Sequence, residues 1–217
     1  MQTRAQGSTL EYITRTFVRE PNYMKAARDE GEHRRPGMQV SSYEGYLLQW
    51  LVQISGAKKI LEIGTFMATS ALWMAEGMGE GGRITSLEFD KESAEVARAH
   101  VAASPHAARI EIVQGDAHAW IAGTPATPTY DLVFIDAEKS GYADYLDAVL
   151  PRMNKRGFIV GDNTLLFGAM AGEATENRVS DAAKKSMTRF NETLADKSKF
   201  EGILLPTPEG LTVARLR

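Results

Sequence analysis

Short apolar runs and amphipathic segments alternate along the middle of the chain. Each apolar run is rich in Val, Ile, Leu or Phe and stops at a glycine or a polar residue, as a buried parallel strand does. The predicted strands are residues 59–64, 83–88, 109–113, 132–135 and 158–160. The segments between them space their apolar residues as helices do, and the predicted helices are residues 70–78, 91–103, 118–122 and 142–153. This alternation is typical of an α/β fold with a parallel sheet.

The C-terminal part departs from that alternation. A predicted helix over residues 180–194 is followed by two strands, residues 203–205 and 211–214, which a short connection with proline and glycine separates. So short a connection permits a hairpin but not a parallel crossover. We therefore predict a Rossmann-like, mostly parallel sheet of seven strands, with helices on both faces and one antiparallel strand at or near an edge. The glycine-rich residues 168–175 are predicted to be a loop.

The N-terminal part has helical spacing and no strand pattern. Residues 8–30 predict a helical segment that Pro21 interrupts, and residues 31–37 predict a loop. Two Ser-x-x-Glu pairs have the spacing of a capping box and predict helix starts: Ser8 with Glu11, and Ser41 with Glu44. The helix that begins near Ser41 should end at Gly56, since glycine commonly follows the last turn of a helix.

The composition is that of an ordinary globular protein. Of the 217 residues, 43% are hydrophobic and 24% are charged, and a net charge of −3 does not indicate a nucleic-acid or membrane partner. The lack of cysteine excludes disulfides, thiolate metal sites and a cysteine nucleophile. No signal peptide or membrane-spanning run is apparent, so we expect a cytoplasmic protein. The length suits one domain, with a helical arm over residues 1–36 and a core over residues 37–217. The tryptophans are predicted to be core residues: Trp50, Trp73 and Trp120.

Two neighbouring predicted strands end at oxygen-bearing side chains. Asp136 follows one of them, and Asp162 and Asn163 follow the next. Ligands of open α/β sheets bind at the carboxyl ends of the strands, so these side chains should share one crevice. Two carboxylates and an amide suit a hard cation such as magnesium or calcium. The alternative is that Asp162 and Asn163 only begin a loop, and that Lys139, three residues beyond Asp136, is a solvated surface lysine.

The first strand predicts a cofactor turn. Glu62 and Gly64 end that strand, and glycine permits close backbone contact with a nucleotide-like ligand. A dinucleotide G-x-G-x-x-G pattern is absent. Glu88 ends the second strand, where a ribose is normally held, and Asp116 after the third could accept a hydrogen bond from an adenine. The alternatives are that Glu62 caps a turn, that Glu88 is a solvated strand end and that Asp116 is a helix N-cap.

Together these residues resemble the cation-dependent O-methyltransferases that use S-adenosylmethionine, the caffeoyl-CoA and catechol O-methyltransferase-like family. The resemblance runs from about Gly37 to the C-terminus. Its motifs are Met38-Gln39-Val40-Ser41 with Glu44-Gly45, Ile60-Leu61-Glu62-Ile63-Gly64-Thr65-Phe66 with Ser70-Ala71-Leu72, Gln114-Gly115-Asp116-Ala117, Phe134-Ile135-Asp136-Ala137-Glu138-Lys139, Gly161-Asp162-Asn163-Thr164-Leu165, Leu204-Leu205-Pro206 and Glu209-Gly210-Leu211-Thr212. So many ordered matches are specific, whereas single motifs would not be.

The resemblance implies a class I methyltransferase fold and a role for each matching residue. It implies that Lys139 is the general base and that Asp136, Asp162 and Asn163 hold a divalent cation, magnesium first and calcium or manganese otherwise. The residues that it implies for S-adenosylmethionine are Met38, Val40, Glu62, Gly64, Thr65, Phe66, Ser70, Glu88, Phe89, Asp116, Ala117 and Asp136. It also implies a cytoplasmic homodimer that methylates a vicinal dihydroxy aromatic molecule.

The chain departs from the family pattern in two places. Met67-Ala68-Thr69-Ser70 stands where the family usually has threonine-glycine-tyrosine-serine, and Leu166-Phe167 stands where it often has tryptophan. These changes affect the cofactor turn and the wall of the acceptor pocket. Three other functions remain open: a metal-independent methyltransferase, a nicotinamide-dependent oxidoreductase and a non-catalytic scaffold. The missing glycine pattern and the C-terminal hairpin argue against the oxidoreductase, and the intact acidic set argues against the scaffold.

Overall fold

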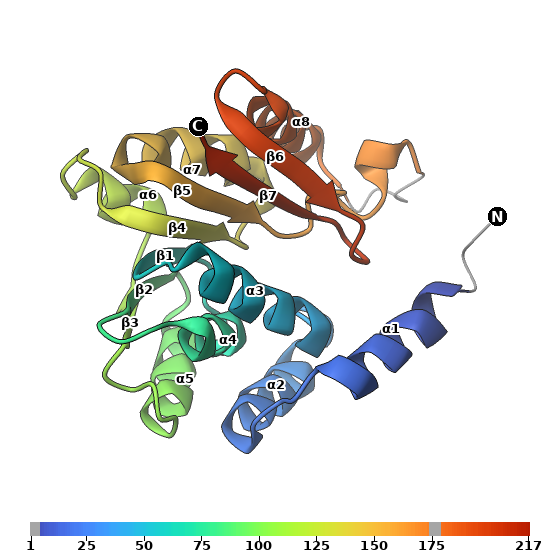
Figure 1. Ribbon diagram of the computed structural model, residues 1–217, viewed down its shortest axis with the longest axis vertical. Helices are drawn as coiled ribbons and strands as arrows, with labels where there is room; N and C mark the ends of the chain where they lie inside the picture. Colours follow the sequence, from blue (N-terminus) through green and yellow to red (C-terminus); the bar gives the residue numbers. More distant parts are fainter. Residues whose placement is uncertain (1–4, 174–178) are drawn as a thin grey trace.

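A seven-stranded sheet forms the centre of the computed structural model, which describes residues 5–173 and 179–217 (Figure 1). The strand order is β3-β2-β1-β4-β5-β7-β6. The strands are β1 (Lys59–Ile63), β2 (Arg83–Glu88), β3 (Ile110–Gln114), β4 (Tyr130–Ile135), β5 (Met153–Gly161), β6 (Phe200–Leu205) and β7 (Leu211–Leu216). Neighbours from β3 to β5 are parallel, whereas β7 is antiparallel to both β5 and β6. The predicted sheet, with its C-terminal hairpin and one antiparallel strand next to an edge, is confirmed.

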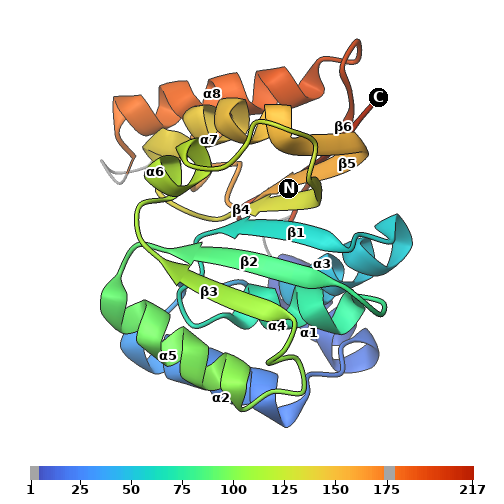
Figure 2. The same ribbon diagram turned by 90° about the vertical axis from the view of Figure 1, so that its left-hand side faces the viewer.

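Helices cover both faces of the sheet. They are α1 (Ala5–Phe17), α2 (Asn22–Arg34), α3 (Ser42–Ser55), α4 (Thr69–Gly77), α5 (Lys91–Ala102), α6 (Ala117–Ala122), α7 (Tyr142–Val149) and α8 (Asp181–Ala195). The helices α2 to α5 lie on one face and α6 to α8 on the other, while α1 extends away from the sheet (Figures 1 and 2). Successive strand residues therefore enter different apolar cores: Ile60 and Leu132 pack with α4, whereas Leu61 and Val133 pack with α7. Burial on both faces explains why these strands are continuous apolar runs.

Local signals set several helix ends. The Glu44 amide donates to the Ser41 hydroxyl at 3.2 Å, and the Ser41 amide donates to the Glu44 carboxylate at 3.0 Å, so the predicted capping box is confirmed. Gly56 ends α3 in the left-handed conformation, with φ of 66°. The prediction of a second box at Ser8 is wrong, because α1 already begins at Ala5.

Other boundaries differ from the predicted ones. The helix α2 continues to Arg34 through the predicted loop, and Gly31 leaves room for the side chain of Gln39, whose Oε1 would lie 2.4 Å from an added Cβ. The helix predicted for residues 142–153 ends at Val149, since a 3₁₀ turn at Leu150–Arg152 leads directly into β5. That strand is consequently longer than predicted.

The glycine-rich segment contains a 3₁₀ turn at Ala169–Ala171, and its residues 174 and 175 lie outside the described ranges. Of the three tryptophans, Trp73 is fully buried, whereas Trp50 is 49% exposed, so its assignment to the core is wrong. None of the helices in the described parts of the chain has the length and apolar character needed to cross a bilayer.

Candidate active site

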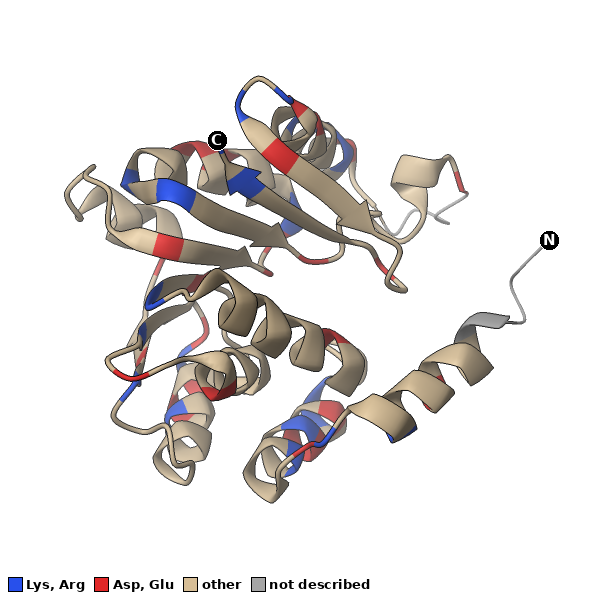
Figure 3. Ribbon diagram, viewed as in Figure 1, with Lys and Arg blue, Asp and Glu red and all other residues tan. Residues whose placement is uncertain are grey.

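The two acidic strand ends lie side by side. The strands β4 and β5 pair so that Ile135 is opposite Gly161, which places Asp136 beside Asp162 at the same edge of the sheet. The Asp162 amide also donates to the Ile135 carbonyl at 3.0 Å. Acidic positions therefore gather where β4 and β5 end (Figure 3). The two acidic residues are therefore neighbours, as expected from the sequence.

Lys139 points back to this edge instead of into solvent. Its ammonium group donates to Oδ1 of Asp136 at 2.9 Å and to the Tyr142 hydroxyl at 2.9 Å. Only 19% of its side chain is exposed. Burial lowers the pKa of Lys139, but its interactions with Tyr142 and Asp136 outweigh burial and raise the pKa well above the usual lysine value. Burial also raises the pKa of Tyr142, which stays a neutral phenol at neutral pH.

Asp162 is a buried acid, and Asn163 after it has an uncommon backbone conformation. Asp162 is 3% exposed, and burial, followed by the charges of Asp136 and Glu44, raises its pKa well above the usual aspartate value. Asn163 has φ of 54°, a left-handed conformation that asparagine tolerates. No group of three His, Asp or Glu side chains that could hold a metal ion is found in the described ranges. In the described structure, Lys139 is the only cation that pairs with these carboxylates.

Glu62 is a completely buried acid in the cofactor turn. Its carboxylate accepts hydrogen bonds from the hydroxyls of Ser70 and Ser86, and none of its side chain reaches solvent. Burial raises the pKa of Glu62 to about 8, against the two serine hydrogen bonds, which lower it. The charges of Asp136 and Glu88 raise it further. Glu62 is therefore an interior group and not the simple turn cap that the alternative interpretation proposed.

Gly64 lies where the turn after β1 meets the residue that follows β4. Its φ is 96°, and a Cβ at this position would lie 1.9 Å from the backbone carbonyl oxygen of Asp136. The Asp136 amide, in turn, donates to the Ile63 carbonyl at 2.9 Å. Any side chain at position 64 would push the two strand ends apart. The glycine thus serves the protein's own packing, whatever it also does for a ligand.

Glu88 is bound to the cofactor turn and is not merely solvated. The amides of Thr65 and Phe66 donate to its Oε2 at 3.2 and 2.7 Å, and the Asp90 amide donates to Oε1 at 2.8 Å. The turn itself uses left-handed residues, with φ of 48° at Phe66 and 64° at Ala68. Ala68 thus adopts a conformation that favours glycine, the residue that the family pattern has nearby.

The remaining predicted cofactor residues differ in their exposure and contacts. Asp116 caps α6 by accepting from the Ala119 amide at 2.7 Å, as the N-cap interpretation predicted, and its side chain is exposed. Ala117 follows it as the first residue of α6. Met38 is 51% exposed and Phe89 is 75% exposed, so both present free apolar surface, whereas Val40 is buried. These positions are compatible with cofactor contacts, which stay a prediction.

Three residues of this edge were not singled out from the sequence. Ser86 holds Glu62, Tyr142 holds Lys139, and Glu44 adds charge near Asp162 while 8% exposed. Ser86 could have been found because it is a polar residue within an apolar strand. Tyr142 could have been found because it lies three residues after Lys139. Glu44 was assigned only to its capping box, and that motif does not indicate that its charge acts on Asp162.

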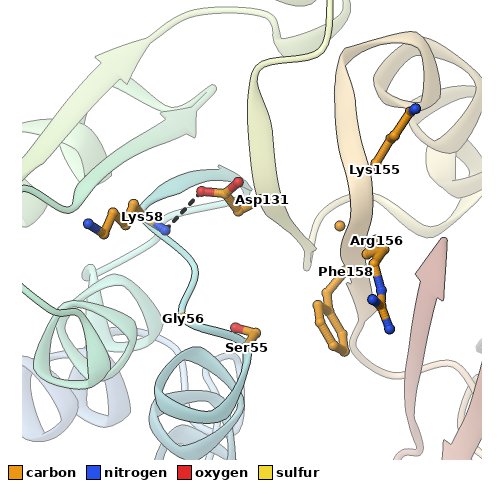
Figure 4. Close-up of a pocket in the computed structure, with 8 residues that line it drawn as sticks. Ser55, Gly56, Lys58, Asp131, Lys155, Arg156 and Phe158 are labelled. Carbon is orange, nitrogen blue, oxygen red and sulfur yellow. Dashed lines mark hydrogen bonds between the residues drawn. The ribbon is translucent and has the colours of Figure 1, made fainter. Parts of the chain in front are cut away.

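A hollow of about 320 Å³ lies at the opposite ends of the strands. It is lined by residues that include Lys58, Asp131, Lys155 and Arg156. Its two lysine ammonium groups point in different directions, and the Asp131 carboxylate already accepts from the Lys58 and Lys59 amides at 2.9 Å (Figure 4). Because this hollow is at the amino end of β4, it is separate from the acidic edge.

The buried Glu62 predicts a pH-dependent stability. Its pKa rises from 4.5 to about 8 on folding, so its contribution is fully present below pH 4.5 and is lost as the pH rises through about 8. Glu62→Gln should therefore raise the melting temperature of the cofactor-free protein at pH 9 but not at pH 4. The gain in the free energy of unfolding at pH 9 should be at most about 5 kcal/mol. Thermal unfolding across this pH range measures the difference. The same effect of the substitution at both pH values would contradict a buried, protonated Glu62.

The strand order defines an α/β protein with acidic side chains at the carboxyl ends of two neighbouring strands, where open α/β sheets bind their ligands. A family model described as O-methyltransferase matches residues 14–217. The chain therefore belongs to this O-methyltransferase family, and the fold, the family and the enzyme class predicted from the sequence are confirmed.

Individual relatives agree with this assignment. The chain is 31% identical over 199 residues to a catechol O-methyltransferase of Niastella koreensis, covering 89% of this chain and 87% of that protein. It is 29% identical over 215 residues to a caffeoyl-CoA O-methyltransferase of Stellaria longipes, covering 94% and 88%. The crystal structure of the O-methyltransferase TomG from Streptomyces achromogenes in complex with SAM, 30% identical, superposes with a TM-score of 0.85 over 100% of this chain and 99% of that one.

Proposed function

We propose that this protein transfers a methyl group from S-adenosylmethionine to one hydroxyl of a vicinal dihydroxy aromatic molecule, with the help of a divalent cation. The observation that carries the proposal is the pairing of Asp136 with Lys139 beside the buried Asp162, at one edge of the sheet. Relatives named for catechol and caffeoyl-CoA support this acceptor class, and a neighbour in complex with SAM supports the donor.

The residues that would hold the cation are Asp136, Asp162 and Asn163. When bound, a divalent cation supplies positive charge that lowers the pKa of a coordinated hydroxyl and, by offsetting Asp136, that of Lys139. The carboxylates fix its place on two neighbouring strands that pair directly. A diol bound there has its two oxygens oriented before reaction, which removes part of the entropic barrier.

Lys139 takes the proton of the reacting hydroxyl on its Nζ, and it must be neutral to do so. The resulting oxygen lone pair forms the new O–C bond while the electrons of the S–C bond return to sulfur, so the sulfonium becomes a neutral thioether. The Tyr142 and Asp136 contacts hold Nζ at the strand edge where the acceptor would lie. Without a cation these contacts keep the pKa of Lys139 raised, which favours the inactive ammonium form.

The donor would occupy the neighbouring turn, at the ends of β1 to β3. Glu88 would hold the ribose and Asp116 the adenine, with Glu62, Gly64, Thr65, Phe66, Ser70 and Ala117 around the rest, and Met38, Val40 and Phe89 covering it. S-adenosylmethionine carries a sulfonium and an ammonium group. Their positive charge would complement Glu88 and Asp136, whose charges raise the pKa of the buried Glu62.

We also propose that the protein is a homodimer, since α3 exposes large apolar side chains. Trp50 is 49% exposed and Ile54 is 57% exposed, and such surface is often covered by a partner. Trp50→Glu should shift the protein from dimer to monomer in sedimentation experiments, whereas Glu95→Lys on α5 should not. A monomeric wild-type protein would contradict this proposal.

The direct test incubates the protein with labelled S-adenosylmethionine and a panel of catechol-type acceptors, with and without magnesium. Methylation that requires the metal supports the proposal. Methylation that persists in excess EDTA would favour a metal-independent methyltransferase instead. No methyl transfer to any vicinal diol, despite measurable S-adenosylmethionine binding, would overturn the acceptor class.

A further inference from the structure

Tyr142 places its hydroxyl at the meeting point of the base and both acidic strands. The side chain is fully buried at the start of α7. Its oxygen lies 2.9 Å from Nζ of Lys139, 3.0 Å from the Ile135 carbonyl oxygen and 2.8 Å from the Asp162 carbonyl oxygen. Three groups from three separate segments therefore converge on one atom.

The chemistry of a hydroxyl fits these three partners. A phenol has one proton to donate and lone pairs that accept. The ammonium group of Lys139 donates to the oxygen, and the single proton is shared between the two carbonyls. One carbonyl belongs to the residue before Asp136 and the other to Asp162 itself. The hydroxyl thus links the proposed base to the backbone of both proposed metal-ligand segments.

Packing holds the tyrosine ring in a fixed place. The ring meets Phe190 of α8 edge-on, with centroids 5.3 Å apart. Phe190 also fills the space over Gly161, where an added Cβ would lie 2.7 Å from its ring. The amide of Ala143, the next residue, donates to the Ser186 hydroxyl at 3.0 Å. Because these contacts fix the tyrosine ring and the start of α7 on α8, the hydroxyl is held in one place.

We propose that Tyr142 is a positioning residue for methyl transfer, whose hydroxyl orients Lys139 and sets the spacing of Asp136 and Asp162. The inference rests on the proposed function, in which Lys139 is the base and the two aspartates bind a divalent cation. A purely structural tyrosine would contribute only through its ring, and phenylalanine would then replace it without consequence for the site.

The test compares Tyr142→Phe with Lys139→Ala and with the double variant. Tyr142→Phe should lower kcat by roughly 10–100-fold, the range expected for losing one hydrogen bond to a charged group. The KM for the acceptor and the Kd for S-adenosylmethionine should stay within about twofold, since the hydroxyl touches neither proposed binding surface. At a metal concentration that saturates every variant, the double variant should be no slower than Lys139→Ala alone, because Tyr142 then acts through the lysine.

Binding of Mn²⁺, followed by electron paramagnetic resonance, gives a measurement that needs no turnover. Tyr142→Phe should raise the Kd for Mn²⁺ by about tenfold, the low end of the effect of residues that orient metal ligands. Lys139→Ala should leave Mn²⁺ binding intact, since both carbonyl contacts of Tyr142 remain. Tyr130→Phe, at the far end of β4, is the matched control. Its hydroxyl has no hydrogen bond to another described residue, and it should behave as wild type.

Wild-type kcat and Mn²⁺ affinity in a folded Tyr142→Phe variant would overturn the inference. Additive losses in the double variant would overturn the link through Lys139. If wild type binds Mn²⁺ but methylates no vicinal diol, the proposed function fails, while the Mn²⁺ measurement still decides whether Tyr142 sets the ligand spacing. Thermal unfolding of each variant separates these effects from loss of the fold, which should persist because phenylalanine keeps the contact with Phe190.

Discussion

Replacing Lys139 with alanine should lower kcat by roughly 10²–10⁴-fold, the usual contribution of a general base. The amine is the group next to Asp136 that can take a proton from an acceptor, and in the described structure no other lysine or histidine pairs with that carboxylate. Binding of S-adenosylmethionine should be unchanged, because the proposed donor residues Glu62 and Glu88 belong to β1 and β2, whereas Lys139 follows β4. Single-turnover methylation at saturating magnesium measures the step directly.

Lys139→Arg is the matched control for charge. Arginine keeps the ion pair with Asp136 but stays protonated at all accessible pH values, so it should be nearly as slow as alanine. In the wild type, activity should rise with pH, because the raised pKa of Lys139 keeps it protonated at neutral pH. Higher magnesium should move this rise to lower pH. Full turnover in Lys139→Ala would remove the lysine from the mechanism.

Replacing Asp162 with asparagine should have opposite effects on activity and stability. The loss of a metal ligand should lower turnover by roughly 10²–10⁴-fold, corresponding to several kcal/mol of lost charge stabilisation. The metal-free variant should nevertheless melt higher at pH 8. The raised pKa of Asp162 means that its stability contribution is lost as the pH rises through that pKa, and asparagine removes this cost. Each kcal/mol should appear as about 2–4 °C.

Asp131→Asn, on the neighbouring strand β4, is the control of opposite sign. Asp131 accepts hydrogen bonds from two backbone amides and from Asn154, and these bonds lower its pKa against the effect of burial. This substitution should lower the melting temperature while leaving metal binding intact. Magnesium should stabilise wild type and Asp131→Asn but not Asp162→Asn. A variant Asp162→Asn that is still stabilised by magnesium would rule out Asp162 as a ligand.

The sheet was predictable because its physical causes are local. Parallel strands buried on both faces leave apolar runs, and the short connection before Leu211 excludes a parallel crossover. Helix boundaries were less predictable where tertiary contacts decide them. Gly31 looked like a helix stop, yet the side chain of Gln39 occupies the space beside it. Nothing in the local sequence reports that contact.

The site was predictable where residues end strands, as Asp136 and Asp162 do. It was not predictable where a residue acts across the fold. Tyr142 has the pattern of any buried helical residue, and only the structure brings its hydroxyl to the Asp162 carbonyl. The alternatives for Glu62 and Glu88 could likewise not be separated from spacing alone. Their hydrogen bonds show that both acids belong to the turn after β1.

The close contact at Gly64 couples the position of the turn after β1 to the position of Asp136. Backbone touches backbone there, with no side chain to absorb a displacement. A shift of the donor turn by a fraction of an ångström is passed directly to the carbonyl of Asp136, and a shift of Asp136 is passed back. Engineering a new donor specificity would thus retune the cation affinity at the same time, and both would have to be optimised together.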